Sequence, residues 1–255
     1  MKRLLVIGIG AGDPDYLTMQ AIKALNRVDV FFLMDKGPSK DSLIDLRREI
    51  CQRYITEPGY RFVAAQSPER VRGDVDYQTS VSALNRDKQQ TFERLISEEM
   101  ADNECAAFLV WGDPGLYDST LRILQAILDG GRCTFEIEVI PGISSIQALA
   151  AQHQVALNRM GRSVEITTGR RLAAGQASDA DSLVVMLDAE DAYHLFADQE
   201  QYIYWGAYLG TPNEILIAGK LKDVADEIER VRKAARQEHG WIMDTYLIRK
   251  PDSTP

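Results

Sequence analysis

The stretch Phe108-Leu109-Val110-Trp111-Gly112-Asp113-Pro114-Gly115-Leu116-Tyr117-Asp118-Ser119 decides the fold expected of this 255-residue chain. A short apolar run ends in a Gly-Asp-Pro-Gly loop, and a helical pattern begins near Ser119. A buried strand that ends in such a loop is typical of the edge at which open α/β sheets bind ligands. The same residue types also favour ordinary turns, so this stretch alone fits either a ligand site or a strand-to-helix turn.

Two further apolar runs end in loops of the same kind. Residues 3–7 predict a strand followed by Gly10-Ala11-Gly12-Asp13, and residues 135–140 predict one followed by Pro141-Gly142-Ile143-Ser144-Ser145. Helical patterns come after these loops, which predicts a parallel sheet whose strand ends lie along one edge. Three such loops at one edge favour a ligand site over three unrelated turns.

The pattern changes after Asn158. The fold class is α/β, with a mostly parallel sheet in a first domain, residues 1–158, and a mixed sheet in a second domain, residues 159–255. Residues 170–178 are expected to form a polar loop. The other principal elements predicted are helices at 41–54, 81–103 and 222–235 and strands at 183–187, 201–207, 214–218 and 241–248.

Composition narrows the class of function. Hydrophobic residues make up 45% of the chain and charged residues 26%, and the net charge is −9. A chain this acidic is not expected to bind nucleic acid, which requires a basic face. No apolar run approaches the roughly 20 residues that span a bilayer, so no membrane segment is expected.

The cysteines and histidines predict a reduced compartment and no metal site. Cys51, Cys105 and Cys133 are odd in number and widely spaced, which indicates reduced thiols and a cytoplasmic protein. The three histidines are isolated from one another and from the cysteines, so none of the usual metal-ligand spacings is present.

The amino-terminal strand-helix-strand pattern also has an alternative interpretation. Gly8-Ile9-Gly10-Ala11-Gly12 is rich in glycine, and Asp35 ends the second predicted strand, as in dinucleotide-binding proteins. Asp13, however, stands where that fingerprint has a glycine, and a carboxylate there would repel a pyrophosphate at the helix amino terminus. An NAD-binding oxidoreductase is therefore the second choice.

The three loops together resemble those of the tetrapyrrole (precorrin/cobalt-precorrin) methyltransferases. The patterns are Gly-x-Gly-x-Gly-Asp at residues 8–13, Gly-Asp-Pro-x-x-Tyr at 112–117 and Pro-Gly-Ile-Ser-Ser at 141–145. The likeness covers nearly the whole chain. It implies two α/β domains with S-adenosylmethionine (SAM) in the cleft between them (the tetrapyrrole methylase fold), S-adenosylhomocysteine (SAH) as product, and a homodimer.

Residues 29–37, 204–212 and 240–247 make the resemblance more specific. They are most similar to family members that methylate C1 of precorrin-5 with loss of acetate, giving precorrin-6A in cobalamin biosynthesis. Members that act at other ring carbons share the same three loops, so another precorrin C-methyltransferase is an alternative. A third interpretation is a non-catalytic protein that carries tetrapyrrole intermediates between enzymes.

The resemblance also implies which residues bind the cofactor. The family usually has proline at the position of Ala11, which leaves the shape of the first loop open. The residues implied are Gly10, Ala11, Gly112, Asp113, Leu116, Tyr117, Ser144 and Ser145, then Met186 or Leu187, Ala207 and Gly210.

The two chemical steps place different demands on side chains. Methyl transfer from a sulfonium needs alignment and a site poor in water more than an acid or a base. Removal of the acetyl group benefits from a general base, for which the candidates are Asp13, Asp113 and Asp118, with Tyr117 as an orienting hydroxyl. Asp113 has a turn-stabilising role as its alternative, and Asp13 has a helix cap as its alternative.

The substrate of such an enzyme is a macrocycle fringed with carboxylates, which requires cations. Lys36, at a predicted strand end, is expected to contact it. Arg47 and Arg48 are expected to lie on a solvated helix face beside acidic neighbours. Tyr208 is assigned to the substrate, and Trp205 and Tyr208 fit either stacking on a flat ring system or burial in the core.

Overall fold

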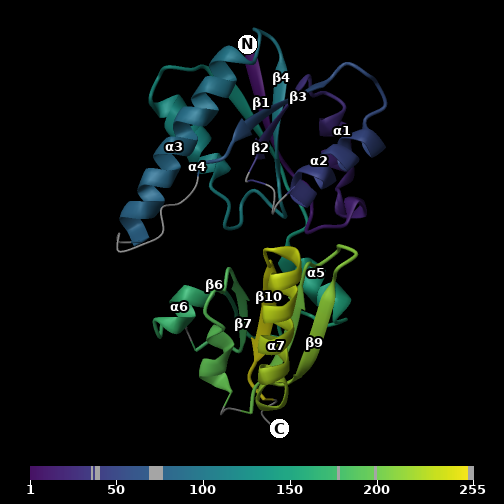
Figure 1. The fold of residues 1–255 in the computed structure, drawn as a ribbon, viewed down its shortest axis with the longest axis vertical. Coiled ribbons are helices and arrows are strands. Elements are labelled where there is room, and N and C mark those ends of the chain that lie inside the picture. Colours follow the sequence, from purple (N-terminus) through teal and green to yellow (C-terminus); the bar gives the residue numbers. More distant parts are fainter. Residues whose placement is uncertain (36, 38–40, 69–76, 177–178, 198–199, 252–255) are drawn as a thin grey trace. The chain divides into compact units, whose positions relative to one another are not determined.

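The computed structural model describes residues 1–255 except 36, 38–40, 69–76, 177–178, 198–199 and 252–255 (Figure 1). They form two compact units, residues 1–144 and 145–255. This division comes earlier than the sequence boundary after Asn158. The reason is helix α5 (Ser145–Gln152), whose apolar face packs against strands of the second unit.

The first unit is built on a parallel five-stranded sheet in the order β3-β2-β4-β1-β5. Strands β1 and β4 are central, and their side chains are almost all buried, as expected of strands covered on both faces. The strands are β1 (Lys2–Gly8), β2 (Val30–Asp35), β3 (Arg61–Gln66), β4 (Cys105–Val110) and β5 (Phe135–Ile140).

Helices cover both faces of this sheet (Figure 1). Successive strand residues point to opposite faces, so Phe31 packs with α1 and α2, whereas Phe32 packs with α3 and α4. The Thr18 hydroxyl accepts a hydrogen bond from the Ala21 N–H and caps α1. The helices are α1 (Met19–Leu25), α2 (Asp41–Tyr54), α3 (Tyr77–Glu98), α4 (Thr120–Asp129) and the short 3-10 helix η1 (Pro14–Tyr16).

The second unit has a mixed five-stranded sheet in the order β6-β7-β10-β8-β9, which confirms the prediction. Only β6 and β7 pair in parallel, and the other neighbours are antiparallel. The elements are β6 (Val164–Thr168), α6 (Gly169–Ala173), β7 (Ser182–Met186), η3 (Ala192–Phe196), β8 (Tyr202–Ala207), β9 (Ile215–Lys220), α7 (Leu221–His239) and β10 (Asp244–Arg249).

The prediction of a polar loop over 170–178 is wrong for its first part. Helix α6 occupies that part because the Thr168 hydroxyl accepts from the Arg171 N–H and Leu172 is buried in the core of the second unit. The sequence marks this helix only by a threonine cap and one apolar residue. A helix this short has no recognisable hydrophobic period.

An ion-pair network around buried Arg232 connects α7 to the turn after β7 and to β10 in the second unit. The guanidinium of Arg232, on α7, pairs with Asp191 at 3.0 Å and with Asp244 at 2.8 Å. It also donates to the backbone carbonyl of Asp188. Burial raises the pKa of the Asp244 carboxyl, and the neighbouring Arg232 opposes that shift.

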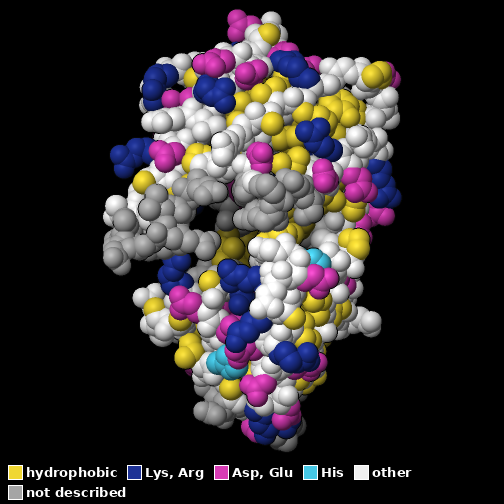
Figure 2. Space-filling view, viewed as in Figure 1, with side chains coloured by type: hydrophobic (Ala, Val, Ile, Leu, Met, Phe, Trp, Pro, Cys, Tyr) yellow, Lys and Arg dark blue, Asp and Glu magenta, His cyan; other side chains and the backbone are white. Residues whose placement is uncertain are grey.

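The surface carries no single-sign patch on the face drawn in Figure 2, where basic and acidic side chains are interspersed. No helix within the described residues is both long and apolar enough to cross a membrane. The same residues contain no group of three or more metal-ligating His, Cys, Asp or Glu side chains.

Replacing Arg232 with Met removes the cation from this network and leaves the buried carboxylate of Asp244 and the partly buried one of Asp191 without it. We expect the free energy of unfolding to fall by about 3–5 kcal/mol, measured by urea denaturation. Lys233→Met is the matched control, because Lys233 is the next residue of α7, its side chain is exposed, and its described ion pair is with the partly exposed Glu229. Its effect should stay within about 0.5 kcal/mol. Equal losses in both variants would contradict a stabilising role for the network.

Candidate functional site

The three predicted ligand loops meet at one edge of the first sheet. Strand β1 lies between β4 and β5, so the loops that follow these three strands are neighbours. The backbones of Gly10 and Gly112 form a bridge, in which the Gly112 N–H donates to the Gly10 carbonyl at 2.8 Å. Gly10 has φ +82° and Gly112 has φ +70°, a conformation that favours glycine.

The loops after β1, β4 and β5 approach so closely that side chains are excluded between them. A Cβ on Gly142 would lie 2.1 Å from the Gly112 carbonyl oxygen, and a Cβ on Gly8 would lie 2.6 Å from the Gly142 nitrogen. Glycine is therefore required at both positions by backbone contact rather than by its own dihedral angles.

Asp113 connects two of these loops. One carboxylate oxygen accepts from the Gly115 N–H at 2.7 Å within its own loop, and the other accepts from the Gly142 N–H at 2.9 Å in the loop after β5. This is the turn-stabilising role given as the alternative for Asp113. Because both oxygens already serve as acceptors, the geometry favours positioning over proton abstraction.

Asp13 also has the structural role given as its alternative. Its carboxylate accepts from the Asp15 N–H at 2.8 Å and caps η1, whose first residue is Pro14. Asp15 in turn pairs with Arg53 and accepts from the Tyr54 hydroxyl, which fixes the first loop against α2. Ala11, where the family usually has proline, is buried within this loop.

Leu116 and Tyr117 follow Asp113 on the same loop. Tyr117 has φ +52°, which is strained for a non-glycine residue, and its side chain is 46% exposed. Tyr117 therefore lies at the surface of the loop that follows β4. Cofactor contact by Gly10, Ala11, Gly112, Leu116, Tyr117 and Ser144 stays a prediction.

In the second unit, four of the predicted cofactor residues gather at one sheet edge. Strand β10 runs antiparallel between β7 and β8, so Met186 and Ala207 end their strands at the same edge. Ser145 joins them, since its hydroxyl lies 2.9 Å from that of Thr245, the partner of Met186 in the register. Leu187 follows Met186 with φ +54° and is 64% exposed.

Other predicted residues of the second unit are occupied by local contacts. Gly210 has φ +75°, and its N–H donates to the Glu214 carboxylate at 2.7 Å. The Tyr208 side chain is 3% exposed, and its hydroxyl donates to the Trp241 carbonyl at 2.5 Å. Trp205 is fully buried and donates to Asp244. Both rings pack in the core of the second unit, which is the second of the two alternatives given for them, and substrate contact by Tyr208 stays a prediction.

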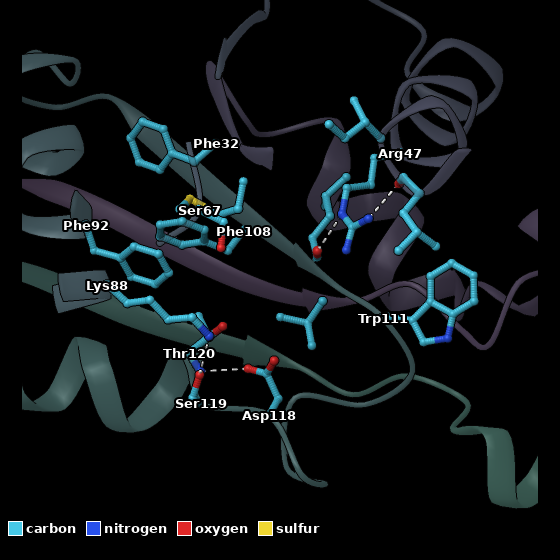
Figure 3. Close-up of a pocket in the computed structure, with 15 residues that line it drawn as sticks. Phe32, Arg47, Ser67, Lys88, Phe92, Phe108, Trp111, Asp118, Ser119 and Thr120 are labelled. Carbon is cyan, nitrogen blue, oxygen red and sulfur yellow. Dashed lines mark hydrogen bonds between the residues drawn. The ribbon is translucent and has the colours of Figure 1, made fainter. Parts of the chain in front are cut away.

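A cavity of about 130 Å³ lies at the carboxyl ends of β2 and β4, where residues of both α2 and α3 line it (Figure 3). Arg47 enters it from α2 and Lys88 from α3, while Asp118 and Ser119 come from the loop after β4. Its apolar wall includes the rings of Phe32, Phe92, Phe108 and Trp111. Lys36, the cation chosen from the sequence, lies outside the described residues.

The expected solvated position is wrong for Arg47. The Arg47 guanidinium donates to the carbonyls of Leu109 at 3.0 Å and Leu43 at 2.6 Å, and so is held in the cavity. Arg48, the next residue, is exposed and lies over the ring of Phe62. Helix α2 turns by about 100° per residue, so two consecutive arginines meet different surroundings.

The cavity lowers the pKa of both of its cations, Arg47 and Lys88. Burial lowers the pKa of Arg47 to about 10, and the nearby Asp118 carboxylate partly restores it. Burial likewise lowers the pKa of Lys88, again opposed by Asp118. The sequence does not predict Lys88 as a site residue. It lies in the long polar helix α3, and the hydrophobic period of one helix does not indicate which other helix faces it.

The comparisons with known proteins agree with this architecture. The family model for tetrapyrrole (corrin/porphyrin) methylases matches residues 3–225. Precorrin-6A synthase [deacetylating] from a Sinorhizobium species is 48% identical over 250 residues, covering 98% of this chain and 96% of that protein.

Solved structures extend the agreement to the fold. A cobalamin synthesis related protein (CobF) from Corynebacterium diphtheriae is 37% identical, with a TM-score of 0.84 over 99% of this chain and 100% of that one. A uroporphyrin-III C-methyltransferase from Thermus thermophilus, complexed with S-adenosylhomocysteine, is 18% identical with a TM-score of 0.57 over 96% of each chain, a likeness of fold alone. The predicted resemblance is thus confirmed, and this chain is a methyltransferase that belongs to the tetrapyrrole (corrin/porphyrin) methylase family.

Proposed function

We propose that this chain transfers a methyl group from SAM to C1 of precorrin-5, with loss of acetate, to give precorrin-6A. The observation that carries the proposal is the 48% identity to precorrin-6A synthase [deacetylating] over nearly the full length of both chains. The alternative of an NAD-binding oxidoreductase has no comparable support, because Asp13 caps η1 where a dinucleotide-binding loop has glycine.

The loops of the first unit fit the sulfonium cofactor. Bound SAM supplies an electrophilic methyl group. The residues proposed to hold it present mainly backbone groups, with Gly10 and Gly112 in left-handed conformations and the half-exposed residue Tyr117 on the same loop as Gly112. Such a surface suits a reaction that disperses positive charge, since alignment and exclusion of water matter more than acid–base groups.

In the second unit, we propose that backbone groups of Met186, Leu187, Ala207 and Gly210 contribute to cofactor binding. Leu187 supports this assignment because its side chain is exposed and its backbone is held in a left-handed conformation by the residues that follow. Asp188, next in the chain, accepts from the N–H groups of Glu190 and Ala192 and from the Tyr246 hydroxyl. These bonds fix the turn on which Leu187 lies.

For the removal of the acetyl group, we assign Asp113 and Asp13 to positioning and Tyr117 to orienting the reacting groups. Both carboxylates already accept backbone hydrogen bonds, whereas the Tyr117 side chain is nearly half exposed. We also propose a cytoplasmic homodimer with Lys36 as a substrate contact, as the family resemblance implies.

Incubation of the purified protein with precorrin-5 and SAM tests the reaction. We expect SAH and acetate in equal amounts and a product with its new methyl group on C1, determined by mass spectrometry and carbon NMR. Calorimetric titration should show binding of SAH and none of NAD.

Each contrary outcome of that experiment has a distinct meaning. Methylation at another ring carbon without acetate release would favour another precorrin C-methyltransferase. Binding of the macrocycle without turnover would favour a carrier. Tight binding of NAD without binding of SAH would refute the proposed methylation of precorrin-5.

Asp113 variants separate positioning from general-base catalysis. Asp113→Ala removes both loop contacts and should weaken SAH binding by about tenfold or more, since charge-assisted hydrogen bonds are lost. Asp113→Asn keeps one acceptor oxygen and should lie between Ala and wild type. If Asp113 were instead the general base, Asp113→Asn would bind SAH normally and abolish acetate release. Asp129→Asn, an exposed change at the end of α4, is the control.

A further inference from the structure

The cavity between α2, α3 and strand β4 borders the loop after β4, but its lining is charged and apolar, unlike the backbone groups assigned to the cofactor. Its described lining holds two cations, Arg47 and Lys88, and one carboxylate, Asp118. One positive charge is therefore in excess. Moving cations out of water is unfavourable unless an anion or hydrogen-bond acceptors compensate, so this lining indicates a place for a monoanion.

The two cations are already oriented toward such a ligand. Arg47 uses Nε and Nη1 on backbone carbonyls, and its Nη2 has no hydrogen-bond partner among the described residues. The Lys88 ammonium has three donors, and its one described hydrogen bond is a long one, 3.4 Å, to the Ser119 hydroxyl. Figure 3 shows the two side chains reaching into the cavity from two different helices.

The carboxylate of Asp118 does not take up these donors. It accepts from the Thr120 N–H at 2.7 Å and so helps to begin helix α4. Its charge still acts on both cations, since it raises the pKa of each against the effect of burial. Asp118 thus favours the charged form of both cations, while its described hydrogen bond is to a backbone N–H.

The size and the wall of the cavity limit what the anion is. About 130 Å³ is close to the roughly 150 Å³ of an apolar cavity that admits benzene, so a whole macrocycle does not fit but a short side chain does. The stacked rings of Phe92 and Phe108 offer an apolar surface beside the cations. A carboxylate on one or two carbon atoms matches both parts of this lining.

We propose that Arg47 and Lys88 bind the carboxylate of a small aliphatic acid in this cavity. Two sources supply that chemistry: an acetate or propionate side chain of the tetrapyrrole, or the free acetate released in the reaction. The choice of source depends on the proposed function, whereas binding of a small carboxylate does not.

Titration with sodium acetate, followed by NMR of carbon-13-labelled acetate, tests the site directly. The wild-type protein should bind acetate in preference to acetamide, which has the same shape without the charge. Arg47→Met and Lys88→Met should each weaken acetate binding by about tenfold or more, because each removes a charged donor. Arg48→Met and Arg86→Met, exposed changes on the same two helices, should leave binding unchanged.

Kinetics with precorrin-5 and SAM separate the two sources. If a substrate side chain occupies the cavity, Lys88→Met raises KM for the tetrapyrrole while SAH binding stays at the wild-type level. If free acetate occupies it, KM stays unchanged, and inhibition of turnover by added acetate is lost in Lys88→Met. Either result supports the proposal and identifies the ligand.

Two results would overturn the proposal: equal binding of acetate and acetamide by the wild-type protein, or unchanged acetate binding in both Met variants. If Arg47→Met fails to fold because it no longer holds the Leu43 and Leu109 carbonyls, Lys88→Met decides alone. A wild-type protein that binds acetate through Lys88 but does not convert precorrin-5 would refute the proposed function and leave the carboxylate site intact.

Discussion

The first unit depends on the contact between three backbones at the carboxyl edge of its sheet. Gly8 and Gly142 come so close to neighbouring backbone that neither could carry a side chain, and the Asp113 carboxylate accepts hydrogen bonds from two of the loops. This contact explains why the edge consists of backbone groups. A site of this kind holds a ligand by shape and by backbone hydrogen bonds, which suits methyl transfer better than reactions that need a nucleophile and a base.

In the second unit, ion pairs rather than backbone contacts fix the conformation of a loop. Asp188 and Arg232 are buried, and together with Asp191 and Asp244 they fix the turn after β7, where Leu187 adopts its left-handed conformation. Buried ion pairs contribute little net stability compared with apolar packing, but they specify one arrangement, because every other arrangement leaves a charge unpaired. The network therefore determines local geometry more than overall stability.

Much of the fold was predictable because it depends on local patterns. Helix 41–54 and strand 135–140 have the predicted bounds, since each combines a clear period with clear end signals. The sequence also indicates the cap formed by Asp13 and the turn stabilised by Asp113, because Asp is common both at helix caps and in turns.

The remaining features depend on tertiary neighbours. No sequence period distinguishes Arg47 from Arg48, and only the packing of α2 on the sheet places one in a cavity and the other in solvent. From the sequence, Tyr208 fits a ligand contact and a core residue equally well. Only the structure shows that α7 and Trp241 cover it. The cavity joins α2, α3 and β4, which are far apart in the chain, so its lining could not be assembled from sequence alone.

The position of β1 in the centre of its sheet has a consequence for synthesis on the ribosome. Arg3 pairs with Cys105 on one side and with Glu136 on the other, so this apolar strand has no partner until well over a third of the chain has emerged. Such long-range parallel pairing slows folding and leaves apolar strands exposed to aggregation in the meantime. The three-loop edge cannot be complete before β5 and the loop after it have been synthesised, because the Gly142 N–H donates to Asp113. A nascent chain shorter than this point contains only two of the three loop motifs, and the edge cannot assemble from them.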